Sequence, residues 1–315
     1  MHGFIANTDQ GWFDFLSRRP HLDEVNFWAP SGKATLKAIP WGSPFLFKLK
    51  SPHHAIGGFG LLGPITSIPL TMAWEAFGEK NGAETLQQMR ERIARYRGAN
   101  TPRLVDPPVG CRTILQPVFF PRELWVEAPA DWAKNIVQGK TYDLTTGEGK
   151  RVWDTCLAHA QALEAQLAPT GTGEPDRPRW GAEQVVRPRL GQGSFRLAVT
   201  DAYGRACAVT GEHSLPVLDS AHIQPFAEGG PHEVRNGLLL RTDIHRLYDR
   251  GYVTVTPDYE FKVSDALRDE YDNGRVYYEL ERAAEGRRRV RVPGDERQRP
   301  DRELLGWHGE RVFRG

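Results

Sequence analysis

The stretch SAHIQPFAEGGPHEVRNGLLLRTDIHRLYD, residues 220–249, predicts a strand, a loop and a helix in that order. Its first residues close an apolar segment, 215–223, that is typical of a strand. A Gly-Gly pair then marks a turn. A helix is expected over 242–251, with Thr242 or Asp243 as its N-cap. This order places side chains from the strand end and from the helix close together.

Three side chains of this stretch are spaced for metal-dependent hydrolysis. His222 lies at the end of the predicted strand. His245 and Asp249 occupy positions i and i+4 of the predicted helix, so both project from one face. An imidazole and a carboxylate on one helix face, opposite a strand histidine, can hold a divalent metal. Phosphodiester hydrolysis needs a base and a cation, and His222 suits the base because the ordinary histidine pKa is near neutrality.

The second half of the chain resembles the HNH, or ββα-metal, nuclease family. The resemblance covers about residues 187–315 and rests on RLGQGSFRLAVTDAYGRACAVTG, SAHIQPFAEGG, RNGLLLRTDIHRLYDRG and LLGWHGERVF. It implies phosphodiester hydrolysis with a divalent metal, Mg²⁺ or Mn²⁺. In this resemblance His222 would be the general base, Asn236 the loop residue that orients the base or braces the site, and His245 a metal ligand.

Two departures from the family pattern change the expected ligands. Many HNH sequences have an Asp or His ligand directly before the base histidine, where this chain has Ala221. His245 is therefore expected to bind the metal with Asp249, whose spacing the helix fixes, or with Asp219, which shares a strand face with Ala221. The CxxC pairs of zinc-containing relatives are missing, and Cys207 stands alone, so no structural zinc is expected.

Several side chains near the site are candidates for contacts with phosphate: Arg189, Gln192, Arg196 and Arg246. For the three in RLGQGSFR, a mixed role that includes anchoring the domain core is expected. The other histidines lack comparable context. His213 and His232 are expected to be loop residues. For His308 two roles are open, an approach to DNA and packing beside Trp307, and packing is favoured.

With 315 residues, the chain is long enough for two domains. The segment LAPTGTGEPDRPRWGAEQ is rich in Pro, Gly and Thr and predicts a linker at 167–186, between domains 1–166 and 187–315. Before the linker, short strands alternate with a few helices, which predicts an α+β fold with a β-barrel-like first module. The expected strands cover 3–8, 24–28, 44–50, 55–63 and 114–120, and the expected helices lie within 9–19, 67–82, 85–98 and 154–167.

The first half resembles a PUA-like module of the EVE/ASCH kind. The motifs are NTDQGWFDFL, EVNFWAPSG, PFLFKL, AWEAFGEKNG and QPVFFP followed by DWAKNIVQGK, over about residues 1–150. Relatives of this fold bind modified bases in an aromatic pocket. Fusion of such a module to an HNH domain resembles modification-dependent (type IV-like) restriction endonucleases.

The motif EVNFWAPSG contains the strongest pocket candidates. On a strand, Asn26 and Trp28 share one face while Val25 and Phe27 share the other. If the second pair packs in the core, the first pair faces a cleft, where an indole and an amide can hold a flipped base. Further candidates are Trp12, Ser31 and Trp41.

The leading hypothesis is a defence endonuclease that flips a modified base, with a modified cytosine favoured, in double-stranded DNA and cuts the backbone. Ala221 motivates one alternative, a non-catalytic reader of modified nucleic acid with a decayed HNH domain. A second alternative is an HNH nuclease that acts on RNA. A homodimer would allow both strands to be cut.

The composition is typical of a protein outside the membrane. The formal net charge is +1, which gives no bulk electrostatic argument for nucleic-acid binding. The three cysteines form no close pair, as expected in a reducing cytoplasm. Neither a signal peptide nor an apolar run long enough to span a bilayer is visible. The expected location is therefore the cytoplasm.

Overall fold

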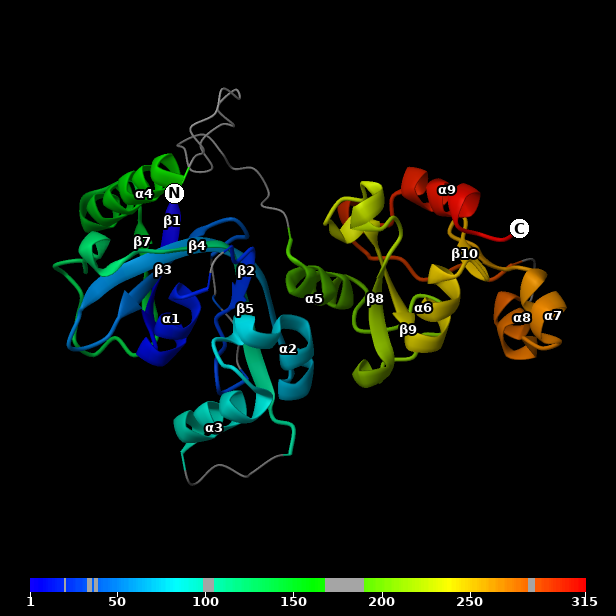
Figure 1. The fold of residues 1–315 in the computed structure, drawn as a ribbon, viewed down its shortest axis with the longest axis horizontal. Coiled ribbons are helices and arrows are strands. Elements are labelled where there is room, and N and C mark those ends of the chain that lie inside the picture. Colours follow the sequence, from blue (N-terminus) through cyan, green and yellow to red (C-terminus); the bar gives the residue numbers. More distant parts are fainter. Residues whose placement is uncertain (20, 33–35, 37–38, 99–104, 168–189, 283–286) are drawn as a thin grey trace. The chain divides into compact units, whose positions relative to one another are not determined.

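The computed structural model describes residues 1–19, 21–32, 36, 39–98, 105–167, 190–282 and 287–315 (Figure 1). Its chain divides into two compact units, Met1–Arg189 and Leu190–Gly315. All of the expected linker except Leu167 lies outside the described residues, as does Arg189. Each unit mixes helices and strands, which confirms the α+β class.

The first unit is built on one seven-stranded sheet in the order β2-β5-β4-β3-β1-β7, with β6 paired to β4. β1 and β3 run parallel, and the other pairs are antiparallel. Among the described residues no pairing joins β7 to β2, so the strands follow an open path and not the closed barrel expected. The strands are β1 (His2–Thr8), β2 (Glu24–Asn26), β3 (Pro44–Leu49), β4 (Ala55–Pro69), β5 (Pro108–Phe119), β6 (Val126–Glu127) and β7 (Gly139–Asp143).

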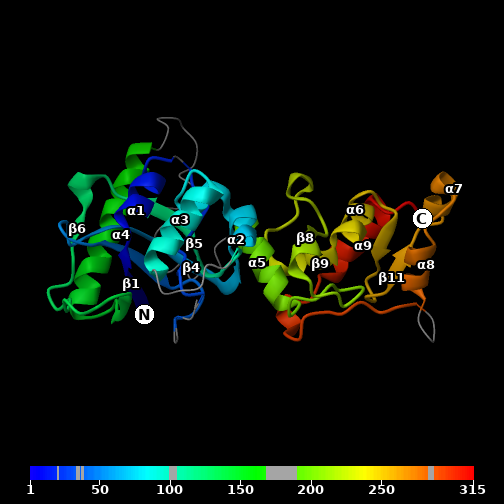
Figure 2. The same cartoon turned by 90° about the horizontal axis from the view of Figure 1, so that it is seen from below.

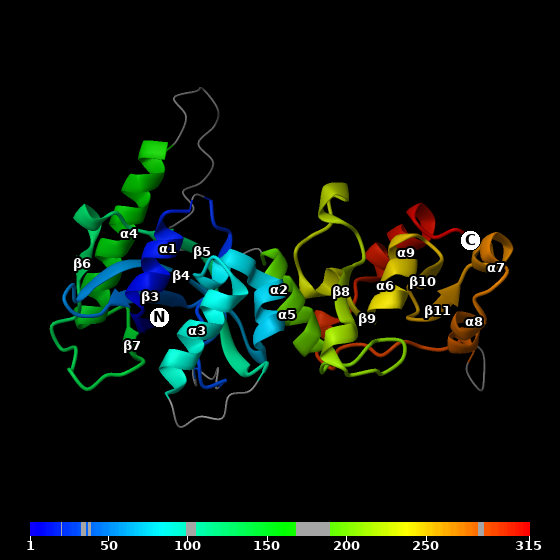
Figure 3. The same ribbon diagram turned by 60° about the horizontal axis from the view of Figure 1, so that its bottom comes forward.

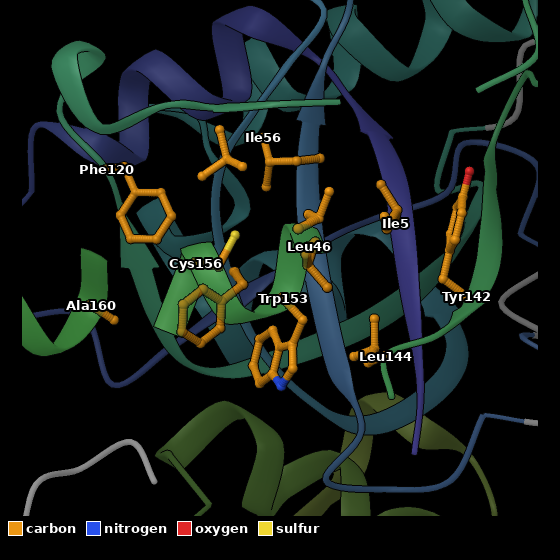
Figure 4. Close-up of a cluster of buried hydrophobic side chains, with 12 residues drawn as sticks. Ile5, Leu46, Ile56, Phe120, Tyr142, Leu144, Trp153, Cys156 and Ala160 are labelled. Carbon is orange, nitrogen blue, oxygen red and sulfur yellow. The ribbon is translucent and has the colours of Figure 1, made fainter. Parts of the chain in front are cut away.

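Alternating side chains of the strands supply apolar cores on both faces of this sheet. Ile5 and Leu46 belong to one cluster, and Phe45 and Phe47 belong to another. Helix α4 (Gly147–Leu167) covers the first cluster, where its Trp153 lies near Leu46 (Figure 4). Helix α1 (Gln10–Ser17) packs on the second cluster. The remaining helices of this unit are α2 (Leu70–Phe77), η1 (Gly78–Asn81), α3 (Leu86–Arg97) and η2 (Arg122–Leu124).

The second unit contains a ββα arrangement. Strands β8 (Leu218–His222) and β9 (Gly237–Arg241) pair antiparallel, and α6 (Thr242–Asp249) begins at the residue after β9 (Figure 2). The expected N-cap of α6 is wrong: the cap position is Arg241, whose guanidinium pairs with the Asp243 carboxylate at 2.6 Å. The other elements are α5 (Gln192–Ala202), η3 (Leu215–Val217), η4 (Phe226–Glu228), η5 (Val234–Asn236), β10 (Val253–Val255), β11 (Phe261–Val263), α7 (Ala266–Tyr271), α8 (Arg275–Glu281), η6 (Glu296–Gln298) and α9 (Arg302–Arg311).

The C-terminal helix α9 packs beside α6 (Figure 3). His308 of α9 is 2% exposed and stacks on Tyr248 of α6, with ring centroids 3.7 Å apart. Its Nδ1 bonds to the Thr254 hydroxyl, and its Nε2 to the Tyr248 carbonyl. His308 is therefore an internal support of α6. In the described part of the chain, no helix combines the length and apolar character needed to cross a membrane.

Candidate active site

The β8–β9–α6 arrangement brings two carboxylates to one histidine ring. Asp219 lies on β8, and His245 and Asp249 lie one turn apart on α6. His245 Nδ1 is 3.5 Å from the Asp219 carboxylate, and His245 Nε2 is 3.4 Å from the Asp249 carboxylate. Both carboxylates proposed from the sequence therefore reach the same imidazole, from opposite sides.

The three side chains perturb one another's protonation. Burial disfavours the charged form of His245, but Asp219 and Asp249 outweigh it, so the His245 pKa is raised. The hydrogen bond to His245 holds the pKa of Asp219 below its ordinary value. Burial raises the pKa of Asp249, with the neighbouring Asp219 charge acting in the same direction. A cation beside Asp249 would relieve this unfavourable environment.

A single metal ion cannot use both nitrogens of the His245 ring, because they point in different directions. Arg196 lies 3.9 Å from Asp219 and already supplies positive charge on the Nδ1 side. On the other side, the 3.4 Å between His245 Nε2 and Asp249 is compatible with both atoms binding one cation at about 2.1 Å. Within the described ranges no three His, Cys, Asp or Glu side chains form a metal-holding group. The imidazole and carboxylate pair fits a divalent metal by donor type.

His222 ends β8 and is held between rings. Its imidazole stacks on Phe195 of α5 with centroids 3.8 Å apart, and His232 approaches edge-on at 5.5 Å. His222 Nε2 is buried without a hydrogen-bond partner among the described residues. Burial, assisted by His232 and His245, lowers the His222 pKa to about 4. The ring is therefore neutral at pH 7 and able to accept a proton.

Asn236 braces the loop between β8 and β9. The side chain is fully buried. Its Oδ1 accepts from the Gln224 amide at 2.9 Å, and its Nδ2 donates to the carbonyls of Gln224 and Pro231 at 2.8 and 2.9 Å. Asn236 thus joins the end of the loop, next to β9, to its beginning after β8. Its side chain makes none of these hydrogen bonds to His222. This geometry supports bracing, one of the two roles expected for Asn236.

The candidate phosphate contacts surround the site unevenly. Gln192 is exposed at the start of α5, and Arg246 is exposed on α6. Arg196 is partly buried beside Asp219, and its backbone carbonyl accepts from the Ser220 hydroxyl. Arg196 therefore anchors β8 and lies beside Asp219 at the edge of the site, and its contact with phosphate stays a prediction.

Asn26 does not face an open cleft in the first unit, which corrects the expectation for it. The side chain is fully buried, and its Nδ2 donates to Asn81 Oδ1 at 2.8 Å and to Cys111 Sγ at 3.3 Å. The cause is tertiary: β2 pairs with β5, Asn26 opposite Thr113, and this sheet face lies under η1. Trp12 is also a core residue, 3% exposed, and donates to the Asn26 carbonyl.

The other three pocket candidates retain exposed surface. Trp28 is partly buried, donates from Nε1 to the Asn81 carbonyl at 2.9 Å, and meets Tyr96 edge-to-face at 6.1 Å. Ser31 is exposed, and Trp41 is 49% exposed. Asn81 therefore links the buried Asn26 to the accessible Trp28.

Sequence reasoning missed three residues around these sites. Phe195 and His232 flank His222, and Asn81 links Asn26 to Trp28. Phe195 had a usable signal, because it is the aromatic residue of RLGQGSFR, the motif that also contains Gln192 and Arg196. For His232 and Asn81 the spacing contained none, since their contacts depend on the paths of loops.

In a comparison with known proteins, the segment that matches a protein family lies in the second unit. Residues 207–256 match the HNH endonuclease family and include His222, Asn236 and His245, which confirms the resemblance of this segment. The chain is similar to an ASCH protein variant from Zymomonas mobilis, at 10% identity and a TM-score of 0.30, over 48% of this chain and 96% of that one. It is also similar to the modification-dependent restriction endonuclease TagI, at 14% identity and a TM-score of 0.28, over 97% of this chain and 79% of that one. None of the curated proteins matches the chain.

Proposed function

We propose that the chain is a modification-dependent DNA endonuclease. The second unit hydrolyses the phosphodiester backbone, and the first unit binds a flipped modified base, with a modified cytosine favoured. The observation that carries the proposal is that the Asp219 and Asp249 carboxylates reach the two ring nitrogens of His245 within the segment that matches HNH endonucleases, with His222 at the end of the same strand as Asp219.

In the proposed reaction His222 is the general base. It is neutral at pH 7 because its pKa is lowered to about 4. The negative charge of a bound phosphodiester raises the pKa of a nearby imidazole and so strengthens it as a base. His222 takes a proton from water, the water oxygen bonds to phosphorus, and the bond from phosphorus to the leaving sugar oxygen breaks. Phe195, stacked on the ring, keeps His222 in one orientation.

His245 and Asp249 would hold the divalent metal, Mg²⁺ or Mn²⁺. When bound, such a cation stabilises charge on the phosphate and the leaving oxygen. Asp219 accepts from His245 Nδ1–H, which leaves Nε2 unprotonated and directed at Asp249. Many HNH sequences have a second metal ligand at the position of Ala221. In this chain Asp219 would compensate for its absence by orienting His245.

Substrate positioning is assigned to the cations and amides around the site. Arg196, Gln192 and Arg246 would contact phosphates flanking the scissile bond. Asn236 holds the β8–β9 loop, and through it the backbone after His222, by its three hydrogen bonds. A net charge of +1 means that these local contacts, and not the whole chain, attract the DNA.

Base recognition is assigned to Trp28, with Ser31 and Trp41 as further contacts. The Asn81 carbonyl fixes the Trp28 indole, and Asn26 fixes Asn81. Asn26 therefore becomes a support of the aromatic contact. A preoriented indole stacks on an extruded base without losing further side-chain freedom.

A cleavage panel tests the pairing of reader and nuclease. Matched duplexes with unmodified, methylated, hydroxymethylated, glucosylated or phosphorothioated positions are incubated with the protein and Mg²⁺ or Mn²⁺, with RNA of the same sequence as competitor. The proposal predicts cutting of at least one modified duplex and sparing of the unmodified one. Equal cutting of all duplexes would contradict modification dependence, and preferential cutting of RNA would favour the RNA nuclease.

Ala221 favours a second candidate, a reader of modified DNA that does not cut. Calorimetry separates the two, because the nuclease must bind Mn²⁺ at His245 and Asp249 whereas the reader need not. Binding of modified DNA without Mn²⁺ binding and without cleavage would support the reader.

A further inference from the structure

The β8–β9 loop, residues 223–236, presents an aromatic side chain to solvent beside the candidate active site. Phe226 of η4 is 60% exposed. Its ring centroid lies 4.6 Å from that of His232, which in turn lies 5.5 Å from that of His222. Phe226, His232 and His222 thus form a continuous row of rings that runs from solvent to the proposed base.

This loop is held firmly, so the position of Phe226 is fixed. Asn236 ties Gln224 and Pro231 together from beneath, and Gln224 Nε2 donates to the Glu228 carbonyl at 2.6 Å. A Cβ at Gly230 would collide with the Gln224 carbonyl, so only glycine allows this close approach. An exposed ring on a braced loop can contact a ligand with little loss of conformational freedom.

The charges of the loop exclude a phosphate-binding role for it. Glu228 and Glu233 are exposed acids. The only basic side chain of 223–236 other than His232 is Arg235, and it is paired with Asp301. On an acidic loop of this kind, the large exposed ring of Phe226 is the side chain best suited to a favourable contact with a nucleobase.

We propose that Phe226 is a substrate-contacting residue that stacks on a nucleobase next to the scissile phosphate. The proposal rests on the proposed nuclease function, because only a substrate bound at His222 would bring a base to the row of rings that ends at Phe226. Aromatic side chains stack on bases that have left the helical stack, and apolar wedges partly unstack base steps in the minor groove. His232, packed between Phe226 and His222, is a positioning residue that sets the distance from stacked base to general base.

The test uses Phe226→Ala and Phe226→Trp, with Val217→Ala as matched control. Val217 is another exposed apolar residue of this unit, 40% exposed. 2-Aminopurine replaces one base at a time on either side of the modified base, in a set of otherwise identical duplexes, so that its placement does not depend on cleavage. Binding is followed by anisotropy and 2-aminopurine fluorescence in Ca²⁺, and cleavage is followed in Mg²⁺.

We expect wild-type protein to raise the 2-aminopurine fluorescence on binding. Phe226→Ala should lose this rise and about tenfold in kcat/KM, the effect of removing one base stack. Phe226→Trp should keep both, and Val217→Ala should match the wild type. A Phe226→Ala protein that cuts and perturbs 2-aminopurine as the wild type does would overturn the proposal. A wild type that binds and perturbs 2-aminopurine but never cuts would instead overturn the nuclease function alone.

A competing explanation is that Phe226 is covered by a second copy of the chain. Sedimentation of wild type and Phe226→Ala separates the two possibilities. The base stack predicts the same mass for both proteins, whereas a dimer lost in Phe226→Ala would assign the ring to self-association. Because the side chain is 60% exposed, Phe226→Ala should leave the thermal unfolding temperature unchanged. An unchanged temperature would exclude misfolding as the cause of a lower cleavage rate.

Discussion

The buried amide of Asn236 allows the bracing of the active-site loop to be measured. Asn236→Ala removes three hydrogen bonds, one to the Gln224 amide and two to the carbonyls of Gln224 and Pro231. At about 1 kcal/mol for each bond, the unfolding free energy of the second unit should fall by about 3 kcal/mol. For a unit of this size, that corresponds to a decrease of about 10 °C in its unfolding temperature.

The assay follows the second unit through the fluorescence that Trp307 contributes, taken as the difference between each protein and its Trp307→Phe version, because the other eight tryptophans lie before Leu190. Cleavage is measured separately at a temperature where the variant is folded. Displacement of the loop beside His222 should lower kcat by about a hundredfold there. Asn273→Ala is the matched control, because the Asn273 side chain is exposed and, within the described part of the chain, its one hydrogen bond is accepted from the neighbouring Gly274 backbone amide. An Asn236→Ala protein with an unchanged unfolding temperature would refute the reasoning on bracing.

Three other predictions concern pH, metal and base recognition. Burial lowers the His308 pKa to about 4, so between pH 6.5 and 4 the unfolded chain binds the extra proton and stability falls as pH falls. Between pH 7 and 5, the unfolding free energy of the wild type, measured in urea, should therefore fall by about 2 kcal/mol more than that of His308→Gln. Equal falls in the two proteins would contradict this. Calorimetry should show that Asp249→Ala weakens Mn²⁺ binding more than Asp219→Asn does, and the reverse order would place the ion beside Asp219. Trp28→Ala should weaken binding of the preferred modified duplex about tenfold relative to unmodified DNA. If Trp41→Ala, and not Trp28→Ala, removed the preference for the modified duplex, the base-binding pocket would be assigned to Trp41.

The sequence was most informative where contacts are local. The segment 220–249 predicted β8 and α6 because one strand, one turn and one amphipathic helix follow each other directly. The spacing of His245 and Asp249 on one helix face needed only the helical repeat, and the structure has these side chains 3.4 Å apart. The distance of Asp219 from the same ring follows from β8 lying beside α6, which period-two alternation alone left open.

The errors lie where residues far apart in sequence meet. Strand alternation correctly predicted that Val25 lies in the core. It could not show that Asn81, 55 residues away, covers the Asn26 side chain on the other face. The proximity of His232 to His222 depends on how Asn236 folds the loop. Arg241 occupies the N-cap of α6, and its guanidinium pairs with the Asp243 carboxylate. No element was predicted for helices α8 and α9.

The central claim is that His222 activates water for DNA cleavage. It is tested most directly by single-turnover cleavage of the preferred modified duplex in Mg²⁺, with wild type, His222→Ala and His213→Ala compared. His213 is an exposed histidine of the same unit and serves as the matched control. The account predicts that His222→Ala lowers the cleavage rate at least about a hundredfold while His213→Ala cuts as the wild type does. Cleavage by His222→Ala at the wild-type rate would contradict it.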